Sequence, residues 1–225
     1  DDFKYLALQE SALISDAVSV SNAVGFWQFK DFTAMEMGMR VDKQIDERMN
    51  IVSASRGAAK YLKQNNFMFN NWLFALQAYQ MGAGGVRHME ITADTYWYVK
   101  KFIAHKVAFE GAVKGEPQVK VQVYELKEKK EISDLARQLG VDEAHLKENN
   151  KWIRSGTIPD DRTYVLLVPG EKLNADFNTL MVSAPSVDAS RTTPAIDKAV
   201  KKEINGVMTI QALGNESTSA LASRA

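Results

Sequence analysis

The sequence predicts an all-α domain over residues 1–112, followed by a small βααβ module and a partly disordered tail. Three observations carry this prediction. Apolar residues recur at helical spacing as far as residue 112, with no convincing strand. Val119, Val121 and Val123 then alternate with polar residues, as in a half-buried strand. Beyond residue 170 the chain becomes rich in Ser, Thr and Asp and poor in large apolar residues.

Composition narrows the class of protein. Of 225 residues, 45% are hydrophobic and 25% are charged, as in ordinary globular proteins. Twenty-eight basic residues balance 28 acidic ones, so the chain is a poor candidate for nucleic-acid binding, which usually needs a basic surface. The absence of cysteine excludes disulfides, thiolate catalysis and cysteine-ligated metals. The three histidines, His88, His105 and His145, are scattered, so we expect no metal site and no cofactor.

The first 112 residues carry the spacing of about six helices. The expected helices cover residues 2–13, Phe29–Gly38, Asp46–Asn65, 72–81 and Thr95–Ala112, with a glycine-rich break at Met81–Gly85 and a short helical turn after it. Either Asn70 or Asn71 can cap the helix at 72–81. The last helix is expected to turn four apolar side chains inward, namely Val99, Phe102, Ile103 and Val107.

Residues 113–118 contain glycine and proline and are predicted to link this domain to a module over residues 119–169. The module is expected to contain a strand around Val121, a helix from Ile132 ended by Gly140, a second helix capped by Asp142, and a strand at Thr163–Val168. Residues 170–205 are predicted to be a second linker with a short helix at 194–204. Residues 206–225 begin with a β-like run at Val207–Ala212.

One carboxylate stands on an apolar helix face. Phe3, Leu6, Ala7 and Glu10 are spaced so that they share one face of the first helix. An ionisable group on a buried face costs free energy unless it is paired or kept protonated by a raised pKa. A carboxylic acid held neutral near pH 7 is what acid catalysis of glycoside cleavage requires. The alternative is a solvated glutamate at the end of a core helix.

An aromatic cluster around one amide follows at Gly25–Phe29, and aromatic faces with an amide suit a sugar ring. In a helical bundle, several polar and aromatic residues can converge with this cluster on one cleft: Glu10, Ser11, Ser19, Gly25, Phe26, Trp27, Gln28, Tyr79 and Tyr98. Glu10 would then be the proton donor. The amide and hydroxyl groups would hold the sugar, and Phe26 and Trp27 would line the groove. The alternative is a core role, because Trp and Tyr at helical spacing are usually core residues.

A standard glycosidase uses two carboxylates that flank the bond. The nearest second candidate is Asp16, in the loop after the first helix, followed by Asp31, Asp42 and Asp46. A loop or capping role accounts equally well for each of them. The glycosidase interpretation therefore needs a reaction that one acid can carry out.

The motifs of residues 3–110 resemble those of a known catalytic domain. They are Glu10-Ser11, Ser19, Ala23–Phe29, Asp46-Glu47-Arg48, Ala58–Leu62, Ala78-Tyr79 with Gly82, Thr95, and Tyr98–Phe102. In this order and spacing they resemble the lytic murein transglycosylases of the membrane-bound type D subgroup, which have a lysozyme-like fold. Two positions depart from that family: Gln80 replaces its Asn, and Ile14-Ser15-Asp16 lacks its Asp/Asn-Pro.

The resemblance implies non-hydrolytic cleavage of the β-1,4 bond between N-acetylmuramic acid and N-acetylglucosamine. Glu10 would act alone as general acid and then as base, forming a 1,6-anhydro ring without metal or cofactor. The implied substrate-binding residues are Ser11, Ser19, Gly25, Phe26, Trp27, Gln28, Tyr79, Gln80 and Tyr98. Two alternatives stay open: a peptidoglycan-binding protein without catalysis, favoured by Gln80, and a hydrolytic muramidase that uses Asp16.

Residues 119–169 resemble a divergent LysM module, and residues 206–225 resemble the start of a second, incomplete one. The first likeness rests on Leu135-Ala136, Leu139–Val141, Leu146, Asn149, Ile158-Pro159 and Val165–Pro169. It implies binding of N-acetylglucosamine-containing glycans, with a structural spacer as the alternative. The expected partner is the peptidoglycan strand, bound by a monomer. By resemblance the location is the periplasm or outer membrane, with membrane association only through a lipid anchor upstream of this chain.

Overall fold

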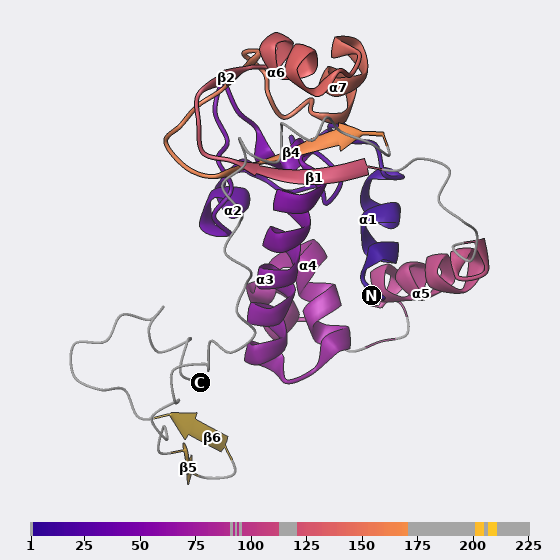
Figure 1. The fold of residues 1–225 in the computed structure, drawn as a ribbon. Helices are drawn as coiled ribbons and strands as arrows, with labels where there is room; N and C mark the ends of the chain where they lie inside the picture. The colour runs from indigo at the N-terminus through magenta and orange to yellow at the C-terminus, as the bar shows by residue number, and fades with distance from the viewer. Residues whose placement is uncertain are drawn as a thin grey trace.

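The computed structural model describes residues 2–90, 92, 94, 96–112, 121–170, 201–204 and 207–210, the last two ranges by their backbone. We call residues 2–112 the helical part and residues 121–170 the αβ module (Figure 1). The helical part contains α1 (Lys4–Ser11), α2 (Asp31–Glu36), the 3₁₀ turn η1 (Glu47–Met49), α3 (Ile51–Phe69), α4 (Trp72–Arg87) and α5 (Trp97–Phe109). The prediction of a helical first half is confirmed, with isolated β-bridges such as Val18–Val24 in its loops.

Asparagine side chains fix where α3 and α4 begin. Asn50 Oδ1 accepts hydrogen bonds from the N–H groups of Val52 and Ser53, and Asn71 does the same at the start of α4. Asn71 is therefore the cap, whereas Asn70 ends α3 in the left-handed conformation at φ 47°. The helix predicted from Asp46 begins only at Ile51, because Asn50 is extended and η1 precedes it.

The structure confirms one predicted detail of α4 and contradicts one of α5. The glycine-rich break predicted at Met81–Gly85 is a kink at Gly82 (φ 77°, ψ 158°), and the helical turn predicted after it continues to Arg87. In α5, Val99 and Phe102 are buried, but Ile103 and Val107 are 47% and 71% exposed. The inward orientation predicted for those two is wrong because α5 packs along one side, against α1 and α4.

The core of the helical part forms where small residues let the helices approach. Leu6, Ala54, Ala58 and Leu62 are almost fully buried within one apolar cluster that also contains Trp27 and Phe102. Among the described residues, no helix is both long enough and apolar enough to span a membrane. On α1, the face that packs into this cluster ends at the half-buried Glu10, as the spacing of its apolar residues predicts.

The αβ module contains β1 (Val121–Leu126), β2 (Lys130–Glu131), α6 (Ile132–Leu139), α7 (Glu143–Asn149), β3 (Thr157–Ile158) and β4 (Tyr164–Pro169). β1 pairs antiparallel with β4, from Val121 opposite Pro169 to Leu126 opposite Tyr164, and β2 pairs with β3. Gly140 ends α6 at φ 67°, and Asp142 caps α7. The predicted β-α-α-β order is confirmed, with the short β2–β3 pair added.

The tail contains an antiparallel pair, β5 (Lys201–Ile204) and β6 (Val207–Ile210). The strand predicted at Val207–Ala212 is confirmed for Val207–Ile210. The helix predicted at 194–204 is wrong for residues 201–204, which pair with β6. A lone strand would leave its N–H and C=O groups unpaired, and β5 supplies the partner. Residues 113–120, 171–200, 205–206 and 211–225 lie outside the described residues. The predictions that fall on them are the linker at 113–118, Val119 of the first strand, most of the linker at 170–205, and the disordered tail.

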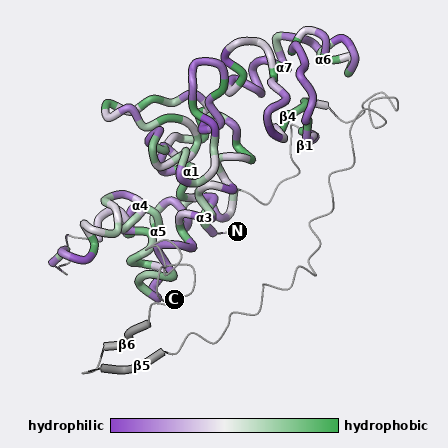
Figure 2. The backbone as a smooth tube through the Cα atoms, turned by 90° about the vertical axis from the view of Figure 1, so that its left-hand side faces the viewer, coloured by the Kyte–Doolittle hydropathy of each residue, from purple (hydrophilic) through white to green (hydrophobic). Residues whose placement is uncertain are grey.

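The helical part and the αβ module share one apolar cluster. Val24, Ile45 and Met49 of the helical part pack in it with module residues such as Trp152 and Leu166. In Figure 1, β1 and β4 lie beside the N-terminal end of α3, and a β-bridge joins Ile45 to Ile153. Figure 2 shows hydrophobic and hydrophilic residues interleaved along both parts. The sequence signal for a linker at 113–118 gave no indication of this contact.

Candidate active site

Glu10 lies in the last turn of α1 and is half-buried against α5. The hydroxyl of Tyr98, which is 3% exposed, donates a hydrogen bond to Glu10 Oε1. Burial raises the pKa of the Glu10 carboxyl, and the Tyr98 hydrogen bond and the nearby Lys101 charge oppose that rise. The pKa of Tyr98 is raised strongly by burial and by the adjacent carboxyl, so its hydroxyl stays protonated as a donor. This arrangement can hold Glu10 in either protonation state.

Ser11 joins α1 to the turn Gly25–Phe29. Its side chain is buried, and Oγ lies 2.9 Å from the carbonyl oxygen of Phe26 and 3.2 Å from that of Ala7. A serine hydroxyl has one proton to donate, so these carbonyls are alternative acceptors. Ser11 therefore fixes the end of α1, and with it Glu10, against the aromatic turn.

The conformation of the turn Gly25–Phe29 depends on the residue types at positions 25 and 28. Gly25 has φ +85°, and a Cβ there would lie 1.9 Å from the carbonyl oxygen of Arg48. Gln28 is left-handed at φ 50°, and its Nε2 donates to the carbonyls of Ala17 (3.1 Å) and Gly25 (3.0 Å). The Gln28 amide nitrogen thus holds the preceding loop, a role the sugar-binding prediction did not include.

The aromatic residues divide between the core and the surface. Trp27 is 6% exposed, and its Nε1 donates to Ser55 Oγ at 2.9 Å. Tyr79 donates to the Trp27 carbonyl at 2.8 Å, and burial together with the Glu10 charge raises its pKa. Trp27 is therefore a core residue, as the alternative interpretation held, whereas the half-buried Phe26 lines a pocket.

Two predicted substrate residues lie apart from these contacts. Ser19 Oγ accepts a hydrogen bond from the Ala23 N–H at 3.0 Å and lies 3.2 Å from Ser21 Oγ, so it shapes its own loop. Gln80 is exposed on α4. The structure therefore links Glu10, Ser11 and Tyr98 to the aromatic turn and Tyr79, and leaves Ser19 and Gln80 outside this network of described contacts.

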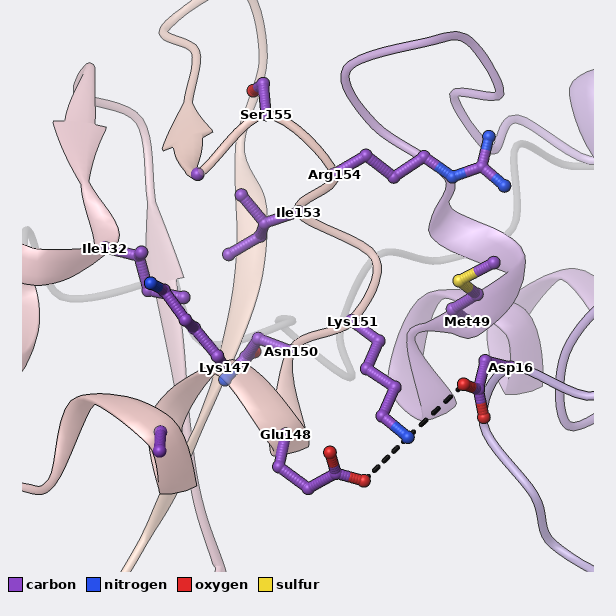
Figure 3. Close-up of a pocket in the computed structure, with 12 residues that line it drawn as sticks. Asp16, Met49, Ile132, Lys147, Glu148, Asn150, Lys151, Ile153, Arg154 and Ser155 are labelled. Carbon is purple, nitrogen blue, oxygen red and sulfur yellow. Dashed lines mark hydrogen bonds and ion pairs between the residues drawn. The ribbon is translucent and has the colours of Figure 1, made fainter.

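Two pockets lie between the helical part and the αβ module, and Glu10 lines neither. The larger, about 730 Å³, is shown in Figure 3, where Lys151 bridges Glu148 and Asp16. The second, about 590 Å³, is lined by Phe26 and by the loop that follows Ser11. Asp16 lines both pockets and pairs with Lys151 at 3.3 Å, so its described partner is a cation of the module.

The sequence analysis gave no contact or role to Lys101, Ser55 or Arg48, although Lys101 and Arg48 lie within the motifs that carry the resemblance. Lys101 acts on the Glu10 charge, and its position one helical turn after Tyr98 is the signal that could have revealed it. Ser55 holds Trp27, and Arg48 supports Gly25. No local sequence pattern predicts these two contacts, because each joins residues far apart in the chain.

Comparison with known proteins shows which family the helical part resembles. Residues 2–97 match the family model described as the transglycosylase SLT domain; that segment includes Glu10, the aromatic turn and Tyr79 and ends one residue before Tyr98. The chain is 23% identical over 216 residues to the membrane-bound lytic murein transglycosylase D of Escherichia coli strain K12 and of strain O6:H1. That similarity covers 85% of this chain and 47% of each relative, so the chain spans about half their length. The helical part that carries Glu10 is thus similar to the transglycosylase SLT domain.

Proposed function

We propose that this chain is a peptidoglycan lytic transglycosylase in which Glu10 is the single acid and base. The observation that carries the proposal is the half-buried Glu10 carboxyl, with its raised pKa and its Tyr98 hydrogen bond. It lies inside the segment that matches the transglycosylase SLT domain. A carboxyl whose pKa is raised stays protonated closer to neutral pH, as a general acid must.

The proposed reaction breaks the β-1,4 bond between N-acetylmuramic acid and N-acetylglucosamine. Protonated Glu10 gives its proton to the glycosidic oxygen as the bond to C1 of the muramoyl residue breaks. The Glu10 carboxylate then takes the proton of the C6 hydroxyl while O6 bonds to C1. This closes the 1,6-anhydro ring and returns Glu10 to its protonated form, without water. The Tyr98 hydroxyl stabilises the carboxylate between the two steps.

The other proposed substrate residues fall into two groups. The described side-chain hydrogen bonds of Ser11, Trp27, Gln28 and Tyr79 are internal to the protein. In this proposal these residues, together with Gly25, therefore act on the substrate by shaping the turn Gly25–Phe29 that contacts it. Phe26, Ser19 and Gln80 offer half-buried or exposed surface to a strand. The αβ module is proposed to be LysM-like and to bind the same glycan, in a monomer located in the cell envelope. The relatives' description as membrane-bound proteins that act on murein supports the substrate and the location.

The hydrolytic alternative needs a second carboxylate near Glu10. Asp16 is its candidate, but Asp16 is paired with Lys151 and lines pockets that Glu10 does not line. The non-catalytic alternative rests on Gln80, which is exposed and leaves the Glu10–Tyr98 pair in place. These observations favour the lytic reaction over both alternatives.

The test is digestion of purified peptidoglycan followed by mass analysis of the released fragments. We expect anhydromuramoyl ends, which are lighter by one water than reducing ends. Glu10→Gln is expected to abolish nearly all release while it retains glycan binding. Glu36→Gln, which changes an exposed glutamate of α2, is the matched control and is expected to retain activity. Reducing ends would identify a muramidase, and no release from the unmodified chain would identify a binding protein. Anhydro ends produced by Glu10→Gln would refute the assignment of Glu10.

A further inference from the structure

Among the contacts between the two parts, which also include those of Arg40 and Gln44 with the module, the segment Asp46–Asn50 makes fully buried ones. The Asp46 N–H donates to the carbonyl of Trp152 at 2.9 Å, and the Asp46 carboxylate lies 3.3 Å from Arg154. Asn50 Nδ2 donates to the carbonyl of Val165 in β4 at 2.7 Å. Asp46 and Asn50 are both fully buried. Because a buried polar group that loses its partner is costly, these bonds hold the module firmly on this segment.

The same segment supports the aromatic turn from its other side. Arg48 forms a two-pronged pair with Asp46, with Nε and Nη2 each 2.8 Å from a carboxylate oxygen. Its remaining nitrogen, Nη1, donates to the carbonyl of Phe29 at 3.3 Å. The backbone carbonyl of Arg48 also lies directly against Gly25, in the space that a Cβ would fill. The segment therefore fixes both ends of the turn Gly25–Phe29.

The turn Gly25–Phe29 also holds the residues next to the Glu10 carboxyl. Its Phe26 carbonyl accepts from Ser11, next to Glu10, and its Trp27 carbonyl accepts from Tyr79. A continuous series of buried and partly buried contacts thus runs from the module, through Asp46–Asn50 and the turn, to the end of α1. Proper geometry at a catalytic group is a large part of its effect, and small displacements reduce turnover steeply.

We propose that the αβ module is a positioning part of the catalytic unit, and that Asp46 and Asn50 are the positioning residues through which it acts. This inference rests on the proposed function for its activity readout. It differs from the view of the module as a tether that only holds glycan. Loosening a tether raises KM, whereas loosening a positioning element lowers kcat.

Asn50→Ser separates the two roles of Asn50. Serine still caps α3, since its hydroxyl accepts from the same N–H groups, but it removes the amide that reaches Val165. The matched control is Asn71→Ser, which makes the same change at a cap with the same pattern at the start of α4. Arg154→Ala is a milder variant on the module side, because Arg154 is partly exposed.

Two measurements on the full chain decide the proposal. Hydrogen exchange is expected to show faster exchange in Asn50→Ser at the bonded amides of Val24, Gly25 and Gln28, with no change there in Asn71→Ser. Peptidoglycan turnover below the unfolding temperature is expected to show kcat about ten-fold lower or more, with KM unchanged. Arg154→Ala is expected to change both in the same direction by less, and it decides the matter if Asn50→Ser does not fold.

The proposal is overturned if exchange at the turn and kcat are both unchanged in the Asn50 variant. It is also overturned if the Asn71 control shows the same faster exchange and the same lower kcat. A rise in KM alone would also overturn it and leave the module as a tether. If the unmodified chain releases no anhydro ends, the proposed function fails, and the exchange measurement still decides whether the module holds the turn.

Discussion

Tyr98 and Glu10, 88 positions apart in the chain, are joined by a hydrogen bond from the tyrosine hydroxyl to Glu10 Oε1. The bond links the first turn of α5 to the last turn of α1. It sets two influences against each other at one carboxyl: burial raises its pKa, and the donated hydrogen bond lowers it. The balance between them decides the pH range in which Glu10 can give up a proton.

Tyr98→Phe removes that donor and little else, since the ring stays in place. The pKa of Glu10 is expected to rise further, because burial is then opposed only by Lys101. Since the proposed reaction starts from protonated Glu10, kcat/KM is expected to fall above its pKa, and this alkaline limb is expected to move to higher pH in the variant. Loss of the buried bond is expected to cost about 1–3 kcal/mol of stability. A pH–rate profile and thermal unfolding measure the two effects.

Tyr79→Phe is the comparison for that profile. Tyr79 donates to the Trp27 carbonyl and not to Glu10, so the alkaline limb is expected to stay in place while turnover decreases. An unmoved alkaline limb in Tyr98→Phe, or equal shifts in both variants, would contradict the role given to the Tyr98 hydrogen bond.

Glu10→Gln is expected to lose activity and to become more stable than the unmodified chain as pH rises. The folded protein raises the pKa of Glu10 above its usual value of 4.5, so the folded state prefers the protonated group. The associated stability is present in full below the unfolded pKa and is lost as pH rises through the folded pKa. The variant, which cannot ionise, is therefore expected to gain stability relative to the unmodified chain as pH rises through that window. Chemical denaturation at several pH values tests this, and a constant difference would refute it.

Gly25→Ala is expected to destabilise the chain severely, by about 3 kcal/mol or more, because the new Cβ meets a backbone carbonyl at a positive φ. Gly38→Ala provides the control. Gly38 also has a positive φ, +100°, but has open space around its Cβ position, so it carries only the backbone strain of about 1–2 kcal/mol. Equal unfolding free energies for the two variants would show that the contact with Arg48 does not restrict the turn.

Asp16→Asn is expected to leave anhydro product formation nearly unchanged. Asp16 is partly exposed and paired with Lys151, and a surface ion pair of this kind contributes about 0–1 kcal/mol. Quantified product release is the measurement. A loss of release comparable to that in Glu10→Gln would instead support the two-carboxylate mechanism.

Local sequence patterns predicted the elements that depend on neighbours in the chain. The 3–4 residue spacing placed α1 and its buried face, and the alternation of valines placed β1. The patterns failed where tertiary packing decides. The spacing of Ile103 and Val107 predicted that they belong to the buried face of α5. They are exposed because α5 packs along one side only, against α1 and α4. Residues 201–204 read as a helix, but they pair with β6.

By itself, the sequence determined that Glu10 ends an apolar helix face, that an aromatic cluster surrounds one amide at Gly25–Phe29, and that helices precede a βααβ module. These follow from helix and strand periodicity, which needs no distant partner. Tertiary structure alone decided that Tyr98 meets Glu10, that Trp27 is a core residue, and that Asp46–Asn50 join the module to the turn. Such contacts depend on which surfaces pack together, and no local periodicity records that choice.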